Sequence, residues 1–158
     1  MPGKKLISGI CFVGLSLWAG DSALDRGTLR GVRAINVVID PLGTQLEGNG
    51  LSRDMLRARI EARLQQAGIA VDPKAVEFLG LRVDSVLARK GPQGLCLSLG
   101  FYQRVVLARD QSIRTATQTW DVSTMLLVAP KPMMEAALNT AEQLADQFVI
   151  AYQSANPR

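Results

Sequence analysis

The sequence predicts an α+β protein, a two-layer sandwich in which a four-stranded, mostly antiparallel sheet carries two helices on one face. Two segments have the apolar period of amphipathic helices, one near the middle of the chain and one at its end. Four segments rich in Val, Leu, Ile and Thr lie between turn-forming residues. Their order is β-α-β-β-β-α, with one extra short strand open at residues 69–71. Because each helix must bury its apolar stripe, both helices are expected on the same side of the sheet.

Length and composition favour a single globular domain. The chain has 158 residues, of which 47% are hydrophobic and 20% charged. Its net charge is +4, and the basic residues are mixed with acidic ones along the chain. A nucleic-acid-binding protein would show a dense basic stripe or stacking aromatics, and aromatic residues are only 5% of this chain. No nucleic-acid partner is predicted.

The first 23 residues are typical of a secretory signal peptide. Two lysines precede an uncharged run from Leu6 to Gly20, and the small-residue stretch "AGDSA" follows its apolar part. The run is 15 residues long, whereas a transmembrane helix needs about 20. We therefore assign residues 1–23 to a cleavable signal and residues 24–158 to one α/β domain, exported to the periplasm.

The cleavage position is ambiguous. Small residues at Gly20 and Ser22 favour a cut after Ser22, with cuts after Ala19 or Ala23 as alternatives, and an uncleaved anchor stays open. Lipid attachment at Cys11 is disfavoured, because bulky Ile10 precedes it and it lies inside the apolar centre. Because an uncleaved anchor stays open, a position near the membrane remains one expectation for the exported protein.

The first strand is predicted at residues 31–40, "GVRAINVVID", after a short polar lead-in at 24–30. Pro41 ends the strand, and the turn-forming residues of 41–50 predict a loop.

The first helix is predicted over residues 51–68. Ser52 is the expected N-cap and Gly68 the left-handed residue that closes the helix. Leu56, Ile60 and Leu64 form its apolar stripe. Arginines flank the stripe, and they indicate either a solvated face or a docking face for an acidic partner.

Three strands follow, at residues 77–89, 94–110 and 112–128. Short turn-like links join them, so an antiparallel meander is expected. In the second strand the alternation of apolar residues blurs after Gly100, which indicates a β-bulge there.

The last helix is predicted to begin near Pro132, a residue favoured at the first helical position. At 100° of rotation per residue, its apolar side chains form one stripe, which is expected to pack against the sheet. The stripe consists of Met134, Leu138, Ala141, Leu144, Ala145, Phe148, Val149 and Tyr152.

The meander face turned away from the helices is the candidate partner surface. An antiparallel sheet tolerates one solvated face, and Tyr and Arg are favoured interface residues. With strict alternation, this face is predicted to carry Arg82, Asp84, Tyr102, Arg104, Thr117, Thr119 and Asp121.

Several stretches resemble a group of small secreted bacterial proteins without assigned function. They are "RGVRAINVVID", "GLSRDMLRARIEARLQQAGIAV", "TQTWDVS" and "LADQFVIAYQSANPR". In that group the chain ends in a helix with an Asp-x-Phe…Tyr…Asn-Pro pattern. The layout also resembles small α/β domains of the cell envelope, such as the amino-terminal domain of the Tol–Pal propeller protein and the lipopolysaccharide-assembly lipoprotein. The resemblance implies this fold and export, and it transfers no active site.

The common catalytic and cofactor motifs are missing from the sequence. The chain has no histidine, so histidine-activated nucleophiles and the usual zinc ligands are excluded. Cys96, the one cysteine left after signal removal, lies in an apolar run and is interpreted as a small buried thiol. "GNG" at 48–50 lacks the third glycine and the βα context of a dinucleotide site. No catalytic residue, cofactor or metal is predicted.

Two functions are consistent with these features. The first is a non-enzymatic periplasmic binding or assembly protein that docks to a partner of the cell envelope, whose identity the sequence does not give. The alternative is a carrier of a small apolar ligand between helices and sheet, since Met125, Met133 and Met134 offer adaptable apolar surface. The oligomeric state is not predicted.

Overall fold

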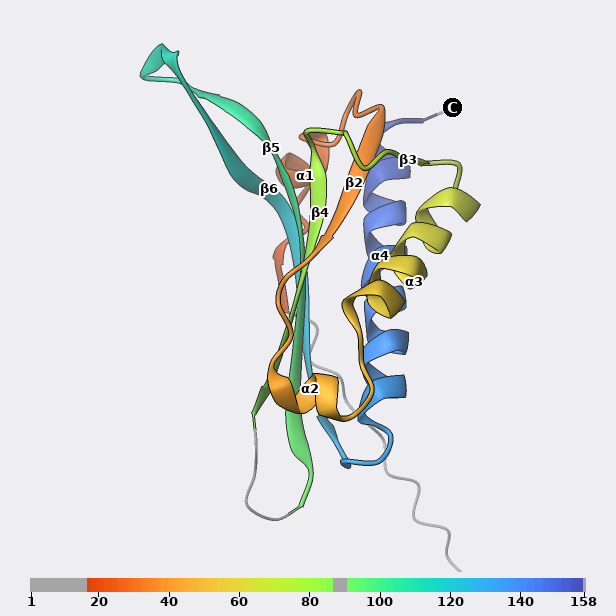
Figure 1. The fold of residues 1–158 in the computed structure, drawn as a ribbon. Helices are drawn as coiled ribbons and strands as arrows, with labels where there is room; N and C mark the ends of the chain where they lie inside the picture. The colour runs from red at the N-terminus through yellow and green to blue at the C-terminus, as the bar shows by residue number, and fades with distance from the viewer. Residues whose placement is uncertain (1–16, 87–90, 158) are drawn as a thin grey trace, which may run out of the picture.

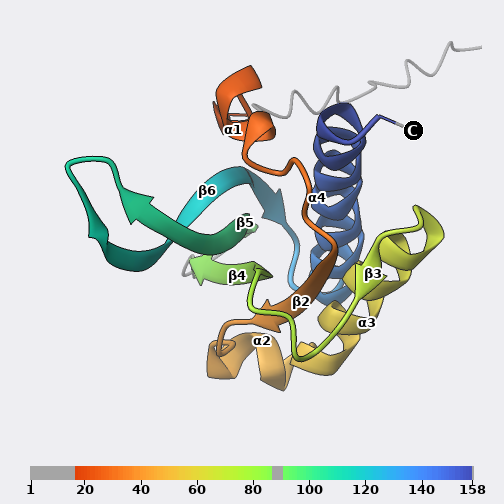
Figure 2. The same ribbon diagram turned by 90° about the horizontal axis from the view of Figure 1, so that it is seen from above.

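A sheet and a pair of helices form the two layers of the protein (Figure 1). The computed structural model describes residues 17–86 and 91–157. The long helices α3 (Arg53–Gln66) and α4 (Met133–Ala155) lie together on one face of the sheet (Figure 2). The predicted α+β two-layer fold, with both helices on one face, is therefore confirmed.

The sheet is mixed, and in the described part of the chain it has the four predicted strands, the short extra strand left open at residues 69–71, and one unpredicted strand at residues 17–20. Its order is β1-β6-β5-β4-β2-β3. Strand β2 is parallel to β3 and β4, and the pairs β4–β5, β5–β6 and β6–β1 are antiparallel. The strands are β1 (Leu17–Gly20), β2 (Ala34–Ile39), β3 (Ala70–Val71), β4 (Phe78–Val86), β5 (Gln93–Leu107) and β6 (Asp110–Val128).

The ends of helix α3 are formed as predicted. The Ser52 hydroxyl accepts a hydrogen bond from the Met55 backbone N–H at 3.2 Å, and Gly68 has φ 77°. Two short helices, α1 (Ala23–Gly27) and α2 (Thr44–Gly48), were not expected. Helix α2 lies in the predicted 41–50 loop because Leu46, which is 1% exposed, packs into the core.

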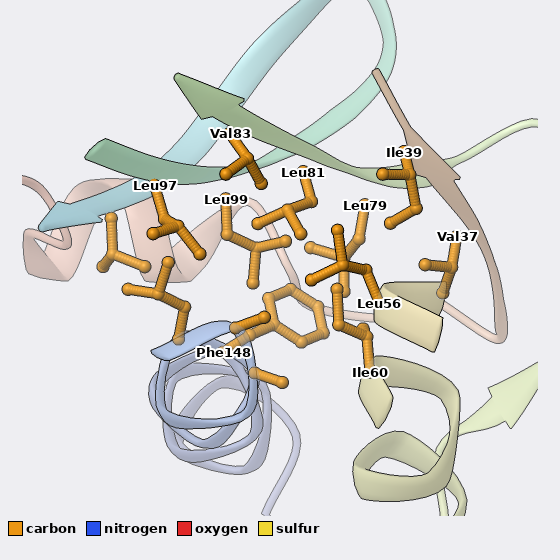
Figure 3. Packing of buried hydrophobic residues seen from close by; sticks show 14 of the residues in the cluster. Val37, Ile39, Leu56, Ile60, Leu79, Leu81, Val83, Leu97, Leu99 and Phe148 are labelled. Carbon is orange, nitrogen blue, oxygen red and sulfur yellow. The ribbon is translucent and has the colours of Figure 1, made fainter. Parts of the chain in front are cut away.

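The core lies between the sheet and the two helices (Figure 3). Leu79 and Leu81 from β4 and Leu97 and Leu99 from β5 point at the helices and are fully buried. Phe148 of α4 projects among them, with no exposed surface. Leu, Val and Phe side chains dominate this layer, as the predicted periodicities require.

Two of the arginines that flank the stripe of α3 face acidic residues of α4. The Arg63 guanidinium donates to Asp146, with 2.7 Å from Nε to Oδ1, and Arg59 lies 3.1 Å from Glu142. The Asp146 carboxylate, to which Arg63 donates, raises the pKa of that guanidinium. The sequence left open whether these arginines are solvated or dock an acidic partner. Arg59 and Arg63 have acidic partners within the same chain.

The closing Asp-x-Phe…Tyr…Asn-Pro pattern positions α4 at its C-terminal end. The Tyr152 hydroxyl donates to the Val32 carbonyl at 2.8 Å. The Asn156 side chain accepts from the Gly31 N–H at 2.8 Å and donates to the Leu29 carbonyl at 3.0 Å. These contacts join the helix end to the segment before β2, more than one hundred residues earlier in the chain.

Asp21 connects the start of the described chain to the sheet. Its carboxylate accepts hydrogen bonds from Trp120 Nε1 at 2.8 Å and from Arg26 Nε at 2.7 Å. Its side chain is 9% exposed, and Trp120 is 1% exposed. The signal peptide stays a prediction, and its residues 1–16, with Cys11, lie outside the described residues. Residues 17–23, also assigned to it, form β1 and the start of α1.

We expect the exported protein to retain Asp21. A cut after Ser22 would remove the acceptor of a buried indole N–H, which costs about 1–3 kcal/mol, whereas a cut after Ala19 leaves Asp21 in place. Amino-terminal sequencing and intact mass of protein isolated from the periplasm measure this. An amino terminus at Ala23 or later would contradict the expectation.

Candidate functional site

The helix-free face of the sheet, defined by β4, β5 and β6, is the candidate site. Side chains alternate along a strand, and Leu81 and Val83 point into the core. Arg82 and Asp84 therefore lie on the helix-free face, where both are exposed. Along β5, Tyr102 and Arg104 continue this face, since Leu99 and Phe101 are buried. These four of the seven predicted residues lie on the predicted face, and Asp121 is a fifth.

A bulge changes the placement of two others; it lies level with the predicted position, but its extra residue is in β6 and not in the strand of Gly100, where it was predicted. The register shifts between Phe101 and Tyr102, so that Tyr102 pairs with Gln118 and Gln103 pairs with Thr117. Thr117 therefore lies on the opposite side of the ribbon from Tyr102, and the prediction for Thr117 was wrong. The strict alternation assumed for β6 fails because the bulge inserts a residue.

Thr119 is the inserted residue, and its placement on the helix-free face was also wrong. Its hydroxyl accepts from Gln103 Nε2 at 2.8 Å, and the same amide donates to the Thr28 carbonyl at 3.1 Å. Asp121 pairs with Gly100 and is on the predicted face, but it is only half-exposed because Gly20 of β1 pairs with it.

A hollow of about 410 Å³ lies at the centre of the helix-free face. Two glycines on neighbouring strands, Gly80 and Gly100, are paired across β4 and β5 and form its floor. Polar and aromatic side chains from three strands, β4, β5 and β6, and from the end of β2 surround it. Its lining consists of Asp40, Phe78, Gly80, Arg82, Ser98, Gly100, Tyr102 and Gln118.

The wall of the hollow is held by stacking and a hydrogen bond. The rings of Phe78 and Tyr102 stack with centroids 4.9 Å apart and planes 8° from parallel. The Tyr102 hydroxyl donates to Gln118 Oε1 at 2.7 Å. Both contacts join residues that are paired across strands, so the wall keeps its shape without a bound molecule.

A side chain at either floor position would push against the wall of the hollow. A Cβ built at Gly100 would lie 2.6 Å from Gln118 Oε1, and one at Gly80 would lie 3.0 Å from Tyr102 Cε2. Sequence reasoning did not select this pair, nor Asp40, Phe78, Ser98 and Gln118. The available signal was a lone glycine inside each predicted strand, which indicates a close approach of another group.

Charge at the rim is largely paired. Arg82 Nε donates to Asp84 Oδ2 at 2.8 Å, with both side chains more than half exposed. Among the described residues Asp40 takes part in no ion pair, so the hollow offers a carboxylate, an amide oxygen and an aromatic face. Such a set accepts hydrogen bonds from a donor-bearing side chain. Within the described ranges, no group of three or more Cys, Asp or Glu side chains is arranged to hold a metal ion.

The same face becomes apolar at the end of the sheet where β4 stops at Val86. Val86, Met125 and Leu127 are 70%, 69% and 63% exposed. Met125 was expected to contribute to a ligand space between helices and sheet, but it lies on the outer face, opposite Cys96. Met133 is fully buried in the core and Met134 half-buried. Cys96 is half-buried rather than fully buried as predicted. The ligand-carrier function itself remains a prediction.

Comparisons with known proteins concern the fold alone. No family model matches the sequence, and no curated protein matches it either. Solved structures that are similar include a PelC dodecamer from Paraburkholderia phytofirmans, at 12% identity and TM-score 0.43, with 90% of this chain and 98% of that chain covered.

Two further structures show a similar chain path. A minor lipoprotein from Acinetobacter baumannii has 13% identity and TM-score 0.37, covering 79% of this chain and 93% of that chain. A protein from Caulobacter crescentus, provisionally assigned as a lipoprotein, has 18% identity and TM-score 0.34, covering 87% and 98%. At this distance a likeness of fold does not transfer an activity. No helix in the described part of this chain is long and apolar enough to cross a membrane.

Proposed function

We propose that this protein is an exported, non-enzymatic binding or assembly protein of the bacterial cell envelope. It docks a partner protein on the helix-free face, with the hollow over Gly80 and Gly100 as the centre of the contact. Export rests on the signal-like opening of the sequence, and the absence of a catalytic role rests on the missing catalytic motifs.

The hollow carries the proposal. Its floor is built from two glycines and its wall from a stacked aromatic pair, so a protruding side chain of a partner fits it without rearrangement. Asp40 and the amide of Gln118 supply hydrogen-bond acceptors for a basic or amide donor on the partner. Tyr and Arg at the rim belong to the residue types enriched in protein interfaces.

Photo-crosslinking in living cells tests this proposal. A photoreactive amino acid at Ser98 inside the hollow is expected to give a discrete crosslinked band with an envelope protein. The same amino acid at Gln65, exposed on helix α3, is expected to give no such band. Equal crosslinking from both positions, or none from Ser98, would contradict docking at the hollow.

Filling the floor should remove the contact. The double substitution Gly80→Ala and Gly100→Ala places a Cβ against the side chains of Tyr102 and Gln118 and is expected to weaken the Ser98 crosslink at least tenfold. Gly94→Ala is the matched control, because a Cβ at Gly94 of β5 meets only Val86, at ordinary distances of 3.6 Å to its Cβ and 3.9 Å to its carbonyl oxygen. The control should crosslink as the wild type does.

A further inference from the structure

The hairpin of β5 and β6 extends beyond the rest of the sheet as an arm, which we define as residues 104–116. Strand β4 pairs with β5 only as far as Tyr102, and β1 pairs with β6 only at Ser123 and Asp121. The arm therefore has no neighbouring strand among the described residues, and it projects away from the helix layer (Figures 1 and 2). Apart from half-buried Val105 and Leu107, all its residues are exposed.

One face of the arm combines guanidinium groups with small apolar side chains. Val106 pairs with Arg114 and Arg104 pairs with Ala116, so these four residues share a face. That face continues the helix-free face along β5, beyond Tyr102. Val106 is 51% exposed, because nothing in the described fold covers it. A basic surface with an exposed aliphatic centre is thus present far from the core.

The arginines of the arm have no carboxylate partner within the described residues. Neither Arg104, Arg114 nor Arg109 of the turn takes part in any ion pair there. The one acid of the arm, Asp110, is occupied by Ser112, whose hydroxyl and backbone N–H donate to Oδ1 at 2.6 and 3.0 Å. The Ser112 hydroxyl and then its N–H lower the pKa of Asp110. Three guanidinium groups therefore remain available to an external anion.

We propose that the arm binds the phosphate headgroups of an anionic membrane surface, with Arg104, Arg109 and Arg114 as the contacts. Guanidinium groups form bidentate hydrogen bonds with phosphate. Val106 enters the region between headgroups and acyl chains. This inference goes beyond docking at the hollow and does not depend on it.

A lipid surface explains the arm better than a protein site does. Residues 104–116 contain no Trp, Tyr or Phe, so the arm lacks the aromatic side chains that anchor protein interfaces. A two-stranded ribbon without a third strand is marginal in water. A headgroup layer neutralises the three guanidinium groups and covers the exposed aliphatic side chains without requiring a complementary shape.

Vesicle flotation tests the proposal with the exported protein in the form isolated from cells. The wild type is expected to float with vesicles of phosphatidylcholine and phosphatidylglycerol in equal parts, and not with phosphatidylcholine alone. Each basic residue at an anionic surface contributes about fivefold in affinity. The triple variant Arg104→Gln, Arg109→Gln, Arg114→Gln should therefore bind about a hundredfold more weakly.

A charge-matched variant separates the arm from net charge. This second triple variant also loses three positive charges, but from exposed positions outside the arm: Arg30→Gln, Arg53→Gln, Lys131→Gln. It should change binding to the vesicles less than about threefold. Thermal unfolding of both variants should match that of the wild type, because the altered side chains are exposed. Equal loss in both variants overturns the proposal. Equal binding of the wild type to vesicles of phosphatidylcholine alone, or no binding to any vesicle, also overturns it. The proposal is likewise overturned if the arm crosslinks to a specific protein and the protein binds no vesicles.

Discussion

Phe148→Ala is expected to lower the free energy of unfolding by about 3–5 kcal/mol. Phe148 is fully buried, and its ring lies 5.7 Å from that of Phe101 and 5.1 Å from that of Trp120, the latter edge-on. Alanine would leave a cavity between α4 and the sheet, where Leu97 and Leu99 cannot follow without strain (Figure 3). Because domains of this size have about 5–15 kcal/mol in total, the variant should be near its folding limit.

Chemical denaturation of the two proteins side by side measures this loss. Ile150→Ala, also on α4 but 59% exposed, is the matched control and should change stability by less than about 0.5 kcal/mol. A loss below about 1 kcal/mol for Phe148→Ala would mean that the helix and the sheet are not packed as described.

Asp21→Ala is expected to cost about 2–3 kcal/mol. The substitution removes the acceptor of the Trp120 indole N–H inside the core and the carboxylate that holds Arg26. Asp21→Asn keeps an oxygen for Trp120 but loses the charge and one acceptor for Arg26, so about half the effect is expected. Asp54→Ala is the control, because the Asp54 side chain is 91% exposed and its pairing with Arg57 is worth under about 1 kcal/mol. Equal effects at Asp21 and Asp54 would contradict the role of Asp21.

The Asp21 contribution should also depend on pH. Burial by itself raises the pKa of the Asp21 carboxyl, but hydrogen bonds from Arg26 and Trp120 and the charge of Arg26 outweigh it, so the pKa is lowered. A carboxyl with a lowered folded-state pKa stabilises fully above its unfolded pKa, about 4. The stabilisation is lost as the pH falls below that value through the folded pKa. The difference in unfolding free energy between wild type and Asp21→Asn should therefore be constant from pH 7 to about 5 and shrink towards pH 3.

On the helix-free face, the alternation of residues along each strand predicts the position of some side chains and not of others. Alternation within β4 and within β5 placed Arg82, Asp84, Tyr102 and Arg104 correctly, because each strand there is regular. The sequence also indicated a bulge near Gly100. It placed that bulge in the strand of Gly100, whereas the extra residue, Thr119, lies in β6, and this difference decides the side on which Thr117 lies.

Residue periodicity, helix caps and turn residues determined the two-layer class, the four main strands and both long helices, because these signals act over a few neighbouring residues. Tertiary structure alone decided three features: the hollow over Gly80 and Gly100, the contact of Asp21 with Trp120, and the free-standing arm. Each depends on which distant segments pair and where that pairing ends. Asp21 and Trp120 are 99 positions apart, and no local pattern specifies that the chain brings them to hydrogen-bonding distance.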